Sequence, residues 1–523
     1  MVATSQPLAT AAGLKILESG GSAADAAVAA AAVLNITEPT STGIGGDCFA
    51  LYFEADSKKI HALNGSGRAP GKLNLDRLEK EGMKELPPYH PYTITVPGAC
   101  AGWFDIQERF GRLTMENVLQ PAIELAESGF PVAPLTSYFW KRGAERQLST
   151  ALNGKEMTIN GRGPNAGECF KNPGLARTFR TLAKKGRSAY YDGEIGEAVV
   201  RTIQEAGGCM EMDDLHNHQS TWDDPISTVF RGIRFWECPP NGQGLAALLA
   251  LNILQDDDLE DMEPLSLLRM HLEVEAMRLA FADTGWYVSD PAFSNIPLEE
   301  LLSRDYALQR RKLINPDRAK VDQVRGVPVG SSDTVYFCVV DSQGNACSFI
   351  NSNYMGFGTG IVPSGWGFTL QNRGHNFSLD KSHPNALEPH KRPYHTIIPA
   401  MATNEEDGSL FGAMGVMGGF MQPQGHLQVF LSLACDHMDP QASLDLPRFC
   451  IEDGTSAGKV ALEEGMPQET ISGLKLLGHE INVVSGYERA LFGRGQIILR
   501  DSESAVLTAG SDPRADGCAM TLL

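Results

Sequence analysis

Two hydroxyl side chains, those of Thr334 and Ser352, stand at the two ends of a stretch that predicts a β-hairpin. In the run "TVYFCVVD", Val335 and Phe337 alternate with Tyr336, which indicates a strand buried on both faces. The following "DSQGN" predicts a turn, and "NACSFINS" predicts the strand that returns. This pairing should bring the hydroxyl of Ser352 back beside Thr334.

A threonine at the start of a strand is ordinary unless the chain is cleaved before it. Cleavage between Asp333 and Thr334 would leave Thr334 with a free α-amine next to its own Oγ. The hydroxyl could then act as a nucleophile and the amine as its base, because an α-amine has a reference pKa of about 7.7–8.0. The pattern therefore predicts a nucleophile that exists only at a new N-terminus.

Glycine clusters at 43–46, 356–360 and 415–419 belong to none of the common catalytic or phosphate-binding motifs. The chain has no G-x-S-x-G elbow, no Walker loop and no G-x-G-x-x-G fingerprint. One interpretation is that these clusters present backbone N–H groups to an anion or oxyanion, where a side chain would block the approach.

Other clusters of reactive side chains favour a structural interpretation. His271 and Glu275 lie one turn apart on a predicted helix, a spacing that can hold a metal, but no second histidine follows at a suitable spacing. The segment "DDLHNH", residues 213–218, also carries ligand-type side chains, and we expect it to be a polar loop. Neither a metal nor another cofactor is expected.

Composition narrows the class of protein further. The 523 residues are 42% hydrophobic and carry a formal net charge of −20, which suits a packed enzyme and argues against a nucleic-acid partner. The ten cysteines are dispersed without a C-x-x-C pair, so free thiols are expected. The start lacks a signal-peptide pattern and the longest apolar run, 26–34, is too short to span a bilayer. We expect a cytoplasmic protein with no membrane partner.

Helices and strands should divide the chain near residue 330 into a helix-rich part and a strand-rich part. Ser22 with Asp25 resembles a capping box, and Gly20 follows the helix before it. The expected elements are helices at 7–19, 22–34, 243–254 and 266–283, strands at 48–55 and 58–67, and several strands after 333.

Several stretches, in this order, resemble the gamma-glutamyltranspeptidase family of N-terminal nucleophile hydrolases. They include "EPTSTGIGGDCF", "VPGACAGW", "PPNGQGLAALLALNIL", "DTVYFCVVDSQGNACS", "GFGTGIV" and "GVMGGFMQPQGHLQV", and the resemblance covers nearly the whole chain. It implies an α/β fold of the four-layer αββα sandwich type. It also implies autocatalytic cleavage into a large subunit, 1–333, and a small subunit, 334–523, intertwined in one body. A dimer of these heterodimers is one assembly that the resemblance allows.

The resemblance assigns catalytic roles residue by residue. Thr334 is the nucleophile, Ser352 matches the second hydroxyl that orients its amine, and the Gly418-Gly419 pair matches the oxyanion-binding glycines. The expected cleavage bond joins Asp333 to Thr334.

The substrate-binding positions depart from the family pattern. Ser66 occupies the position of the arginine that binds the glutamate carboxylate, although Arg68 is close by. The other departures are Tyr354 for an asparagine, Arg373 for a glutamine, Asn376 for an acid, and His395-Thr396 for a serine pair. Losing an acid and gaining a guanidinium favours a substrate carboxylate over an ammonium group.

The pattern is closest to the subgroup with cephalosporin acylases, oxamate amidohydrolase and glutathione hydrolase-like proteins. It predicts an autoprocessing threonine amidohydrolase that acts on a small amide with a carboxylate-bearing acyl group. A shortened lid segment predicts an open site in which hydrolysis exceeds transfer. Two alternatives stay open: a true gamma-glutamyltransferase or glutathione hydrolase, and an unprocessed scaffold that only binds.

Overall fold

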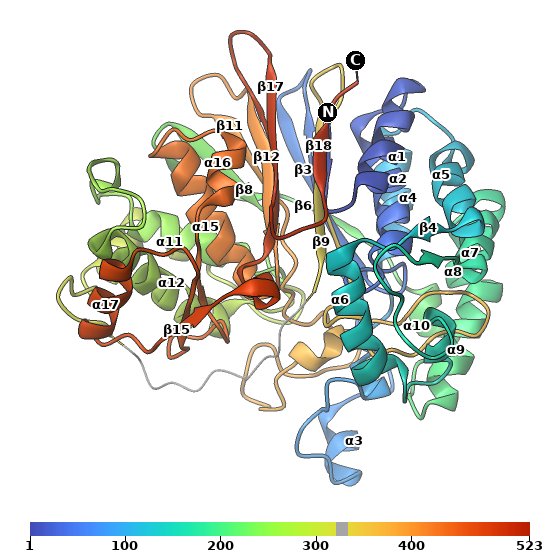
Figure 1. The fold of residues 1–523 in the computed structure, drawn as a ribbon. Helices are drawn as coiled ribbons and strands as arrows, with labels where there is room; N and C mark the ends of the chain where they lie inside the picture. The colour runs from blue at the N-terminus through green and yellow to red at the C-terminus, as the bar shows by residue number, and fades with distance from the viewer. Residues whose placement is uncertain (321–332, 523) are drawn as a thin grey trace.

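A computed structural model describes residues 1–320 and 333–522, and in it two antiparallel β-sheets lie between two layers of helices (Figure 1). The first sheet has the strand order β18 (Cys518–Met520), β1 (Val2–Thr4), β9 (Val335–Val340), β10 (Ala346–Ser352), β2 (Asp47–Glu54), β3 (Lys59–Gly65) and β6 (Thr221–Asp223). The second has the order β17 (Leu507–Ser511), β16 (Arg494–Arg500), β12 (Leu410–Met417), β11 (Ala400–Asn404), β8 (Ile233–Glu237) and β7 (Ile226–Phe230). The predicted αββα sandwich is confirmed.

Strand β9 is buried on both faces, as its alternation predicts. Phe337 and Val339 pack into the core beneath the first helical layer, whereas Tyr336 and Cys338 pack between the two sheets. Every residue of β9 is buried. The central strand of the site is therefore held from both sides by apolar contacts, which leaves little freedom to the residues at its ends.

The β9–β10 hairpin determines where the two hydroxyls meet. The carboxylate of Asp341 accepts the N–H groups of Gln343 and Asn345, which closes the turn at 2.9 and 3.0 Å. The antiparallel register then pairs Val335 with Asn351. Ser352 is the next residue, so it reaches the start of β9.

The first helical layer packs small residues close together over the first sheet. In α2 all fifteen residues are buried, and its start is the predicted capping box between Ser22 and Asp25. The main helices of this layer are α1 (Pro7–Glu18), α2 (Ala23–Thr37), α4 (Ala99–Phe110), α5 (Met115–Ser128), α7 (Pro173–Lys185), α8 (Ser188–Tyr191) and α9 (Glu194–Glu205). Each predicted helix end here agrees with the structure to within a few residues.

The second helical layer covers the outer face of the second sheet. Its members include α11 (Leu245–Ile253), α12 (Leu267–Tyr287), α13 (Leu298–Leu301), α14 (Arg304–Arg311), α15 (Met421–Ala434), α16 (Pro440–Asp445) and α17 (Gln468–Leu476). Helix α6 (Pro134–Gly143) lies beside the sheets, and α3 (Leu75–Lys80) projects from the body (Figure 1). The smaller sheets are β4 (Phe130–Pro131) with β5 (Cys169–Phe170), and β13 (Phe449–Ile451) with β14 (Val460–Glu463) and β15 (Ile481–Val484).

The prediction of a polar loop at 213–218 is wrong. Residues Met212–His216 form the short helix α10, because Glu211 and Asp214 make a capping box and Leu215 is buried as an anchor. His218 is buried behind it and stacks on Tyr191.

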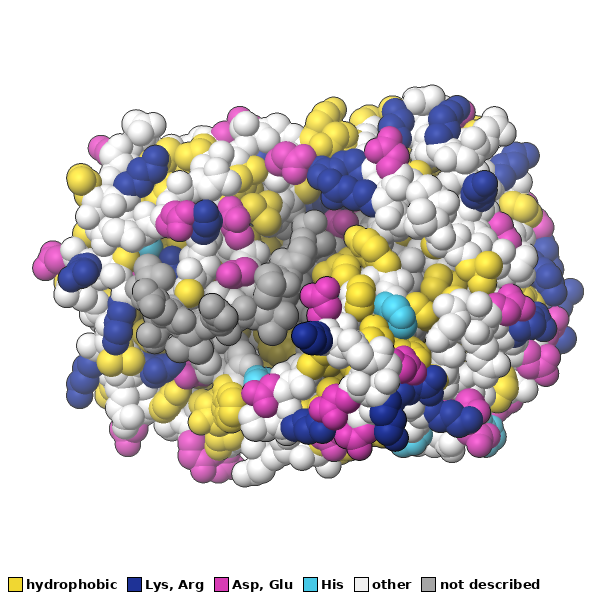
Figure 2. All heavy atoms as spheres, turned by 90° about the horizontal axis from the view of Figure 1, so that it is seen from below, with side chains coloured by type: hydrophobic (Ala, Val, Ile, Leu, Met, Phe, Trp, Pro, Cys, Tyr) yellow, Lys and Arg dark blue, Asp and Glu magenta, His cyan; other side chains and the backbone are white. Residues whose placement is uncertain are grey.

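Other general features agree with the composition. All ten cysteines are free, as predicted. None of the helices within residues 1–320 and 333–522 is long and apolar enough to cross a bilayer. Figure 2 shows acidic and basic side chains intermixed over one face of the molecule. The predicted division at 333/334 follows a segment, 321–332, that lies outside the described residues.

Candidate active site

The hydroxyl of Ser352 connects the predicted nucleophile to the predicted cleavage bond. It donates to the carbonyl oxygen of Asp333 at 3.0 Å and accepts the hydroxyl of Thr334 at 3.1 Å. It also accepts the backbone N–H of Tyr354 at 2.8 Å. Thr334 and Ser352 are both fully buried. One oxygen atom thus contacts both groups that a cleavage reaction before Thr334 would use.

The backbone after β10 holds the chain on the other side of the bond. Tyr354 has φ +80°, a left-handed conformation that side-chain-bearing residues seldom adopt. In this conformation its N–H points to Ser352 and its carbonyl accepts the N–H of Asp333 at 2.9 Å. The residues flanking the bond are therefore fastened to the same turn.

Arg373 lies beneath the two hydroxyls and is completely buried. Its Nη2 donates to Ser352 Oγ at 3.3 Å, and its Nη1 donates to Thr396 Oγ1 at 2.6 Å. The guanidinium carbon is 4.4 Å from the ring centroid of Tyr354. Burial lowers the pKa of Arg373 to about 10, so it stays charged near neutrality. Its positive charge favours electron-rich oxygen at Ser352, and its predicted contact with substrate stays a prediction.

His395 reaches a different partner from the one that the sequence suggests. Its Nε2 donates to Asp47 at 2.9 Å, and both side chains are fully buried. Burial, together with the charge of Arg373, lowers the pKa of His395 to about 3, so the ring is neutral. Asn376 bonds the Tyr394 carbonyl at 3.2 Å and the hydroxyl of Tyr354.

Asp47 is a site residue that sequence reasoning missed. Its carboxylate accepts the N–H groups of Gly67 and Gly98 and the side-chain amide of Gln371, besides the bond from His395. It sits directly after the glycines of "GIGGD", and a charged residue in so apolar a run was the signal that could have identified it. Asp47 ties the loop that carries Arg373 to the start of β2.

Ser66 and Arg68 lie on the far side of Asp47. Ser66 is buried and accepts the Asn241 amide at 3.0 Å. Arg68 donates to the Gln219 carbonyl at 3.2 Å. Among the residues that the structure describes, neither one bonds to Thr334 or Ser352. Their roles in substrate binding stay predictions.

Gly418 and Gly419 form the turn between β12 and α15. Their φ angles are +132° and +61°, which glycine adopts without strain. Their carbonyls accept the N–H groups of Met421 and Gln422. Within the described part of the chain neither glycine N–H donates to another protein group, and their role as oxyanion donors stays a prediction.

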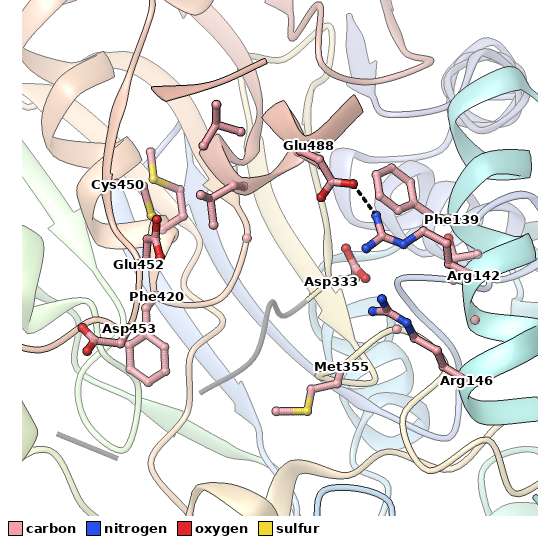
Figure 3. Close-up of a pocket in the computed structure, with 18 of the residues that line it drawn as sticks. Phe139, Arg142, Arg146, Asp333, Met355, Phe420, Cys450, Glu452, Asp453 and Glu488 are labelled. Atoms are coloured by element: carbon pink, nitrogen blue, oxygen red, sulfur yellow. Dashed lines mark hydrogen bonds and ion pairs between the residues drawn. The ribbon is translucent and has the colours of Figure 1, made fainter. Parts of the chain in front are cut away.

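A cavity of about 750 Å³ opens beside the predicted cleavage bond (Figure 3). Asp333 and Gly418 belong to its lining, and burial raises the pKa of the Asp333 carboxyl to about 6 despite Arg494 nearby. Glu452 and Asp453 line one wall, whereas Glu488 lies beside Arg142 on the other and is bonded to it at 2.8 Å. The charged lining residues are Arg142, Arg146, Asp333, Glu452, Asp453 and Glu488.

One cluster of side chains of the metal-ligand type is complete only in the folded chain. His479 comes to lie 2.8 Å from His271, and Glu275 completes a group of atoms within 4.8 Å of one another. Sequence spacing did not reveal this second histidine, because it follows α17 and lies far from His271 along the chain. Arg278 lies 3.6 Å from Glu275, and its positive charge opposes a cation there.

Two antiparallel sheets between two layers of helices are the architecture of the N-terminal nucleophile hydrolases, and a solved cephalosporin acylase has the same fold. The chain belongs to the gamma-glutamyltranspeptidase family, whose model, described as Gamma-glutamyltranspeptidase, matches residues 9–522. This family membership confirms the resemblance that the sequence motifs carry.

Several named relatives of this chain are hydrolases. A glutathione hydrolase-like proenzyme of Bacillus subtilis is 38% identical and covers 99% of this chain and 98% of its own length. The oxamate amidohydrolase proenzyme of Klebsiella pneumoniae is 32% identical, over 98% of this chain and 96% of its own. The crystal structure of cephalosporin acylase from Bacillus halodurans is 43% identical, has a TM-score of 0.92, and covers 99% and 94%. The chain is an enzyme, a hydrolase of this family.

Proposed function

We propose that this chain is the precursor of a threonine amidohydrolase that cleaves itself between Asp333 and Thr334. The observation that carries the proposal is the position of Ser352 Oγ, which is bonded at once to the Asp333 carbonyl and to the Thr334 hydroxyl. If Thr334 were only a structural residue of the strand, its hydroxyl would not need to contact Ser352, the residue that hydrogen-bonds the Asp333 carbonyl.

The cleavage proceeds by transfer of the Asp333 acyl group from nitrogen to oxygen. Thr334 Oγ attacks the carbonyl carbon while Ser352 accepts its proton and donates its own to the carbonyl oxygen. The C–N bond then breaks as the carbonyl re-forms, and the proton on its oxygen passes through Ser352 to the nitrogen, which leaves as the Thr334 amine; an ester now joins Asp333 to Thr334 Oγ. Water opens the ester, which restores the hydroxyl and leaves a carboxylate on the large subunit.

The freed Thr334 then acts on substrate. Its Oγ attacks an amide carbonyl, its α-amine takes the proton and passes it to the leaving amine, and water hydrolyses the acyl-enzyme. The N–H groups of Gly418 and Gly419 supply the oxyanion donors, each typically worth about 3 kcal/mol. Ser352, with its charge partner Arg373, orients the amine.

The substrate class that fits best is a small amide whose acyl group carries a carboxylate. Support comes from the cationic side chains around the bond. Ser66 stands where transpeptidases place the arginine that binds the glutamate carboxylate, which argues against a gamma-glutamyl group. Names of relatives, an acylase and an oxamate amidohydrolase, point the same way. The second candidate is hydrolysis of glutathione, favoured by the relative named glutathione hydrolase-like.

Denaturing gels of the purified protein test the nucleophile. We expect two bands of roughly 36 and 21 kDa for the natural chain, one full-length band for Thr334→Ala, and slower cleavage for Thr334→Ser, which keeps a hydroxyl. N-terminal sequencing of the smaller band should begin at Thr334. A persistent single band from the natural chain would count against self-cleavage and favour the binding scaffold.

A substrate panel tests the class. Glutaryl and gamma-glutamyl p-nitroanilides differ by the α-ammonium group alone, so their relative kcat/KM reports whether the pocket requires it. We expect the glutaryl compound to be preferred. A strong preference for gamma-glutamyl would support the glutathione hydrolase candidate instead.

A further inference from the structure

One arginine of the cavity wall has no hydrogen-bond or ion-pair partner within residues 1–320 and 333–522. Arg146 lies in the π-helical segment Ala144–Leu148 that continues α6, is exposed, and lines the cavity. Among the described residues it makes no hydrogen bond and no ion pair. Arg142, one turn earlier on the same wall, is bonded to Glu488 at 2.8 Å and to the Tyr138 hydroxyl at 3.1 Å. Of the two, Arg146 alone has its donors available.

We infer, on the basis of the proposed function, that Arg146 is the residue that binds the carboxylate of the substrate's acyl group. Its guanidinium offers paired N–H donors that match a carboxylate in a two-bond geometry. This assigns substrate selection to α6, which no sequence motif marks, and not to Arg373.

The chain itself places a carboxylate at this wall. Asp333 supplies the acyl group of the bond to be cleaved, and its side chain lies in the same cavity. Arg142 points toward it from α6, and Arg146 from the π-helical segment that follows (Figure 3). Arg494 approaches the Asp333 carboxylate to 3.7 Å, but it is also bonded to Glu38 at 2.6 Å. The self-cleaving acyl group is thus a carboxylate-bearing one that faces cations, and a substrate of the same kind meets the same wall.

Arg373 is poorly placed for the same task. It is 0% exposed, and its two terminal nitrogens already donate to Ser352 and Thr396. A substrate carboxylate would have to displace both hydroxyls and enter a dry site, which costs more than binding an exposed guanidinium.

The acidic wall opposite Arg146 disfavours binding of the substrate in the reverse orientation. Glu452 and Asp453 line the cavity across from α6 (Figure 3). A carboxylate on that side would meet like charges, so the acyl end has one favourable direction. The leaving amine then points toward the acidic wall.

The test compares two acyl groups of equal length on the cleaved enzyme. Glutaryl p-nitroanilide carries a terminal carboxylate, and pentanoyl p-nitroanilide is its neutral counterpart. Rates are normalised to the amount of cleaved small subunit on a gel. In Arg146→Gln, kcat/KM for the glutaryl compound should fall roughly tenfold to hundredfold, the effect of one charge-assisted pair, while the pentanoyl rate stays near that of the natural enzyme.

A matched control removes a charge from the same helix. Lys141 is exposed on α6 and does not line the cavity, so Lys141→Gln should leave the glutaryl-to-pentanoyl ratio unchanged. Arg373→Gln should lower both rates by a similar factor. The inference is overturned if Arg146→Gln keeps the natural ratio, or if Arg373→Gln selectively removes the glutaryl preference.

A binding measurement separates this inference from the proposed function. Free glutarate should raise the thermal unfolding midpoint of the natural cleaved protein and should have a much smaller effect on Arg146→Gln. If the natural protein hydrolyses neither anilide, the proposed function fails. Glutarate stabilisation that depends on Arg146 would then still support the anion site, and equal stabilisation of both proteins would refute it.

Discussion

Replacing Ser352 with alanine should stop self-cleavage without unfolding the protein. The substitution removes one oxygen atom that donates to the Asp333 carbonyl and accepts from Thr334, Tyr354 and Arg373. The strands β9 and β10 stay paired, because their register depends on backbone bonds and on the turn at Asp341.

The expected effects on cleavage rate and on stability follow from the two roles of the Ser352 oxygen, as hydrogen-bond donor and as acceptor. Loss of one hydrogen-bond donor at a developing oxyanion slows acyl transfer by about 10²–10³-fold, so a cleavage complete within hours would take weeks. The buried donors of Tyr354 and Arg373 also lose an acceptor, which should lower the free energy of unfolding by about 1–3 kcal/mol.

The assay is a time course of precursor and small subunit on denaturing gels, with thermal unfolding of each protein as a measure of folding. Ser348→Ala is a matched control, because Ser348 lies on the same strand and face and its hydroxyl is 2.7 Å from that of Tyr336. This variant also loses a buried hydrogen bond, yet it should cleave like the natural chain. If Ser352→Ala cleaves at the natural rate while staying folded, the relay through Ser352 is refuted.

Two further predictions concern buried cations and histidines. Arg373→Gln should slow self-cleavage roughly tenfold, since the charge-assisted bond to Ser352 is lost, and equal cleavage rates on gels would contradict this. His218 is buried, and neither ring nitrogen is hydrogen-bonded within the described part of the chain. Burial together with Arg392 lowers its pKa to about 3. The unfolded chain binds this proton below about pH 6.5 and the folded protein does not, so stability is lost as pH falls from 6.5 toward 3. The difference in unfolding free energy between His218→Phe and the natural protein should therefore shift in favour of the variant as the pH falls, by at most about 1.4 kcal/mol per pH unit. A pH-independent difference in denaturant melts would refute this prediction.

Much of the scaffold was predictable because its causes are local. The alternation of apolar residues in β9, the turn closed by Asp341, and the capping box of Ser22 and Asp25 each depend on neighbours a few residues away. Strands β7 and β8 escaped prediction, since their half-buried residues have no strong alternation and are stabilised by pairing with each other and, for β8, with β11. The short helix α10 was predicted to be a loop because its sequence is mostly polar, and its single buried leucine, Leu215, gives no helical periodicity.

The sequence by itself determined that Thr334 and Ser352 lie at the ends of one hairpin, since register follows from turn length and alternation. Only the tertiary structure decided which charges surround them. Arg373 is buried against Ser352, His395 is bonded to Asp47, and Arg146 has no bonded partner among the residues that the structure describes. The physical reason is that an ion pair or a desolvated charge depends on partners brought together from distant segments. Residue types show the sign of a charge, but its neighbours and its exposure are properties of the folded chain.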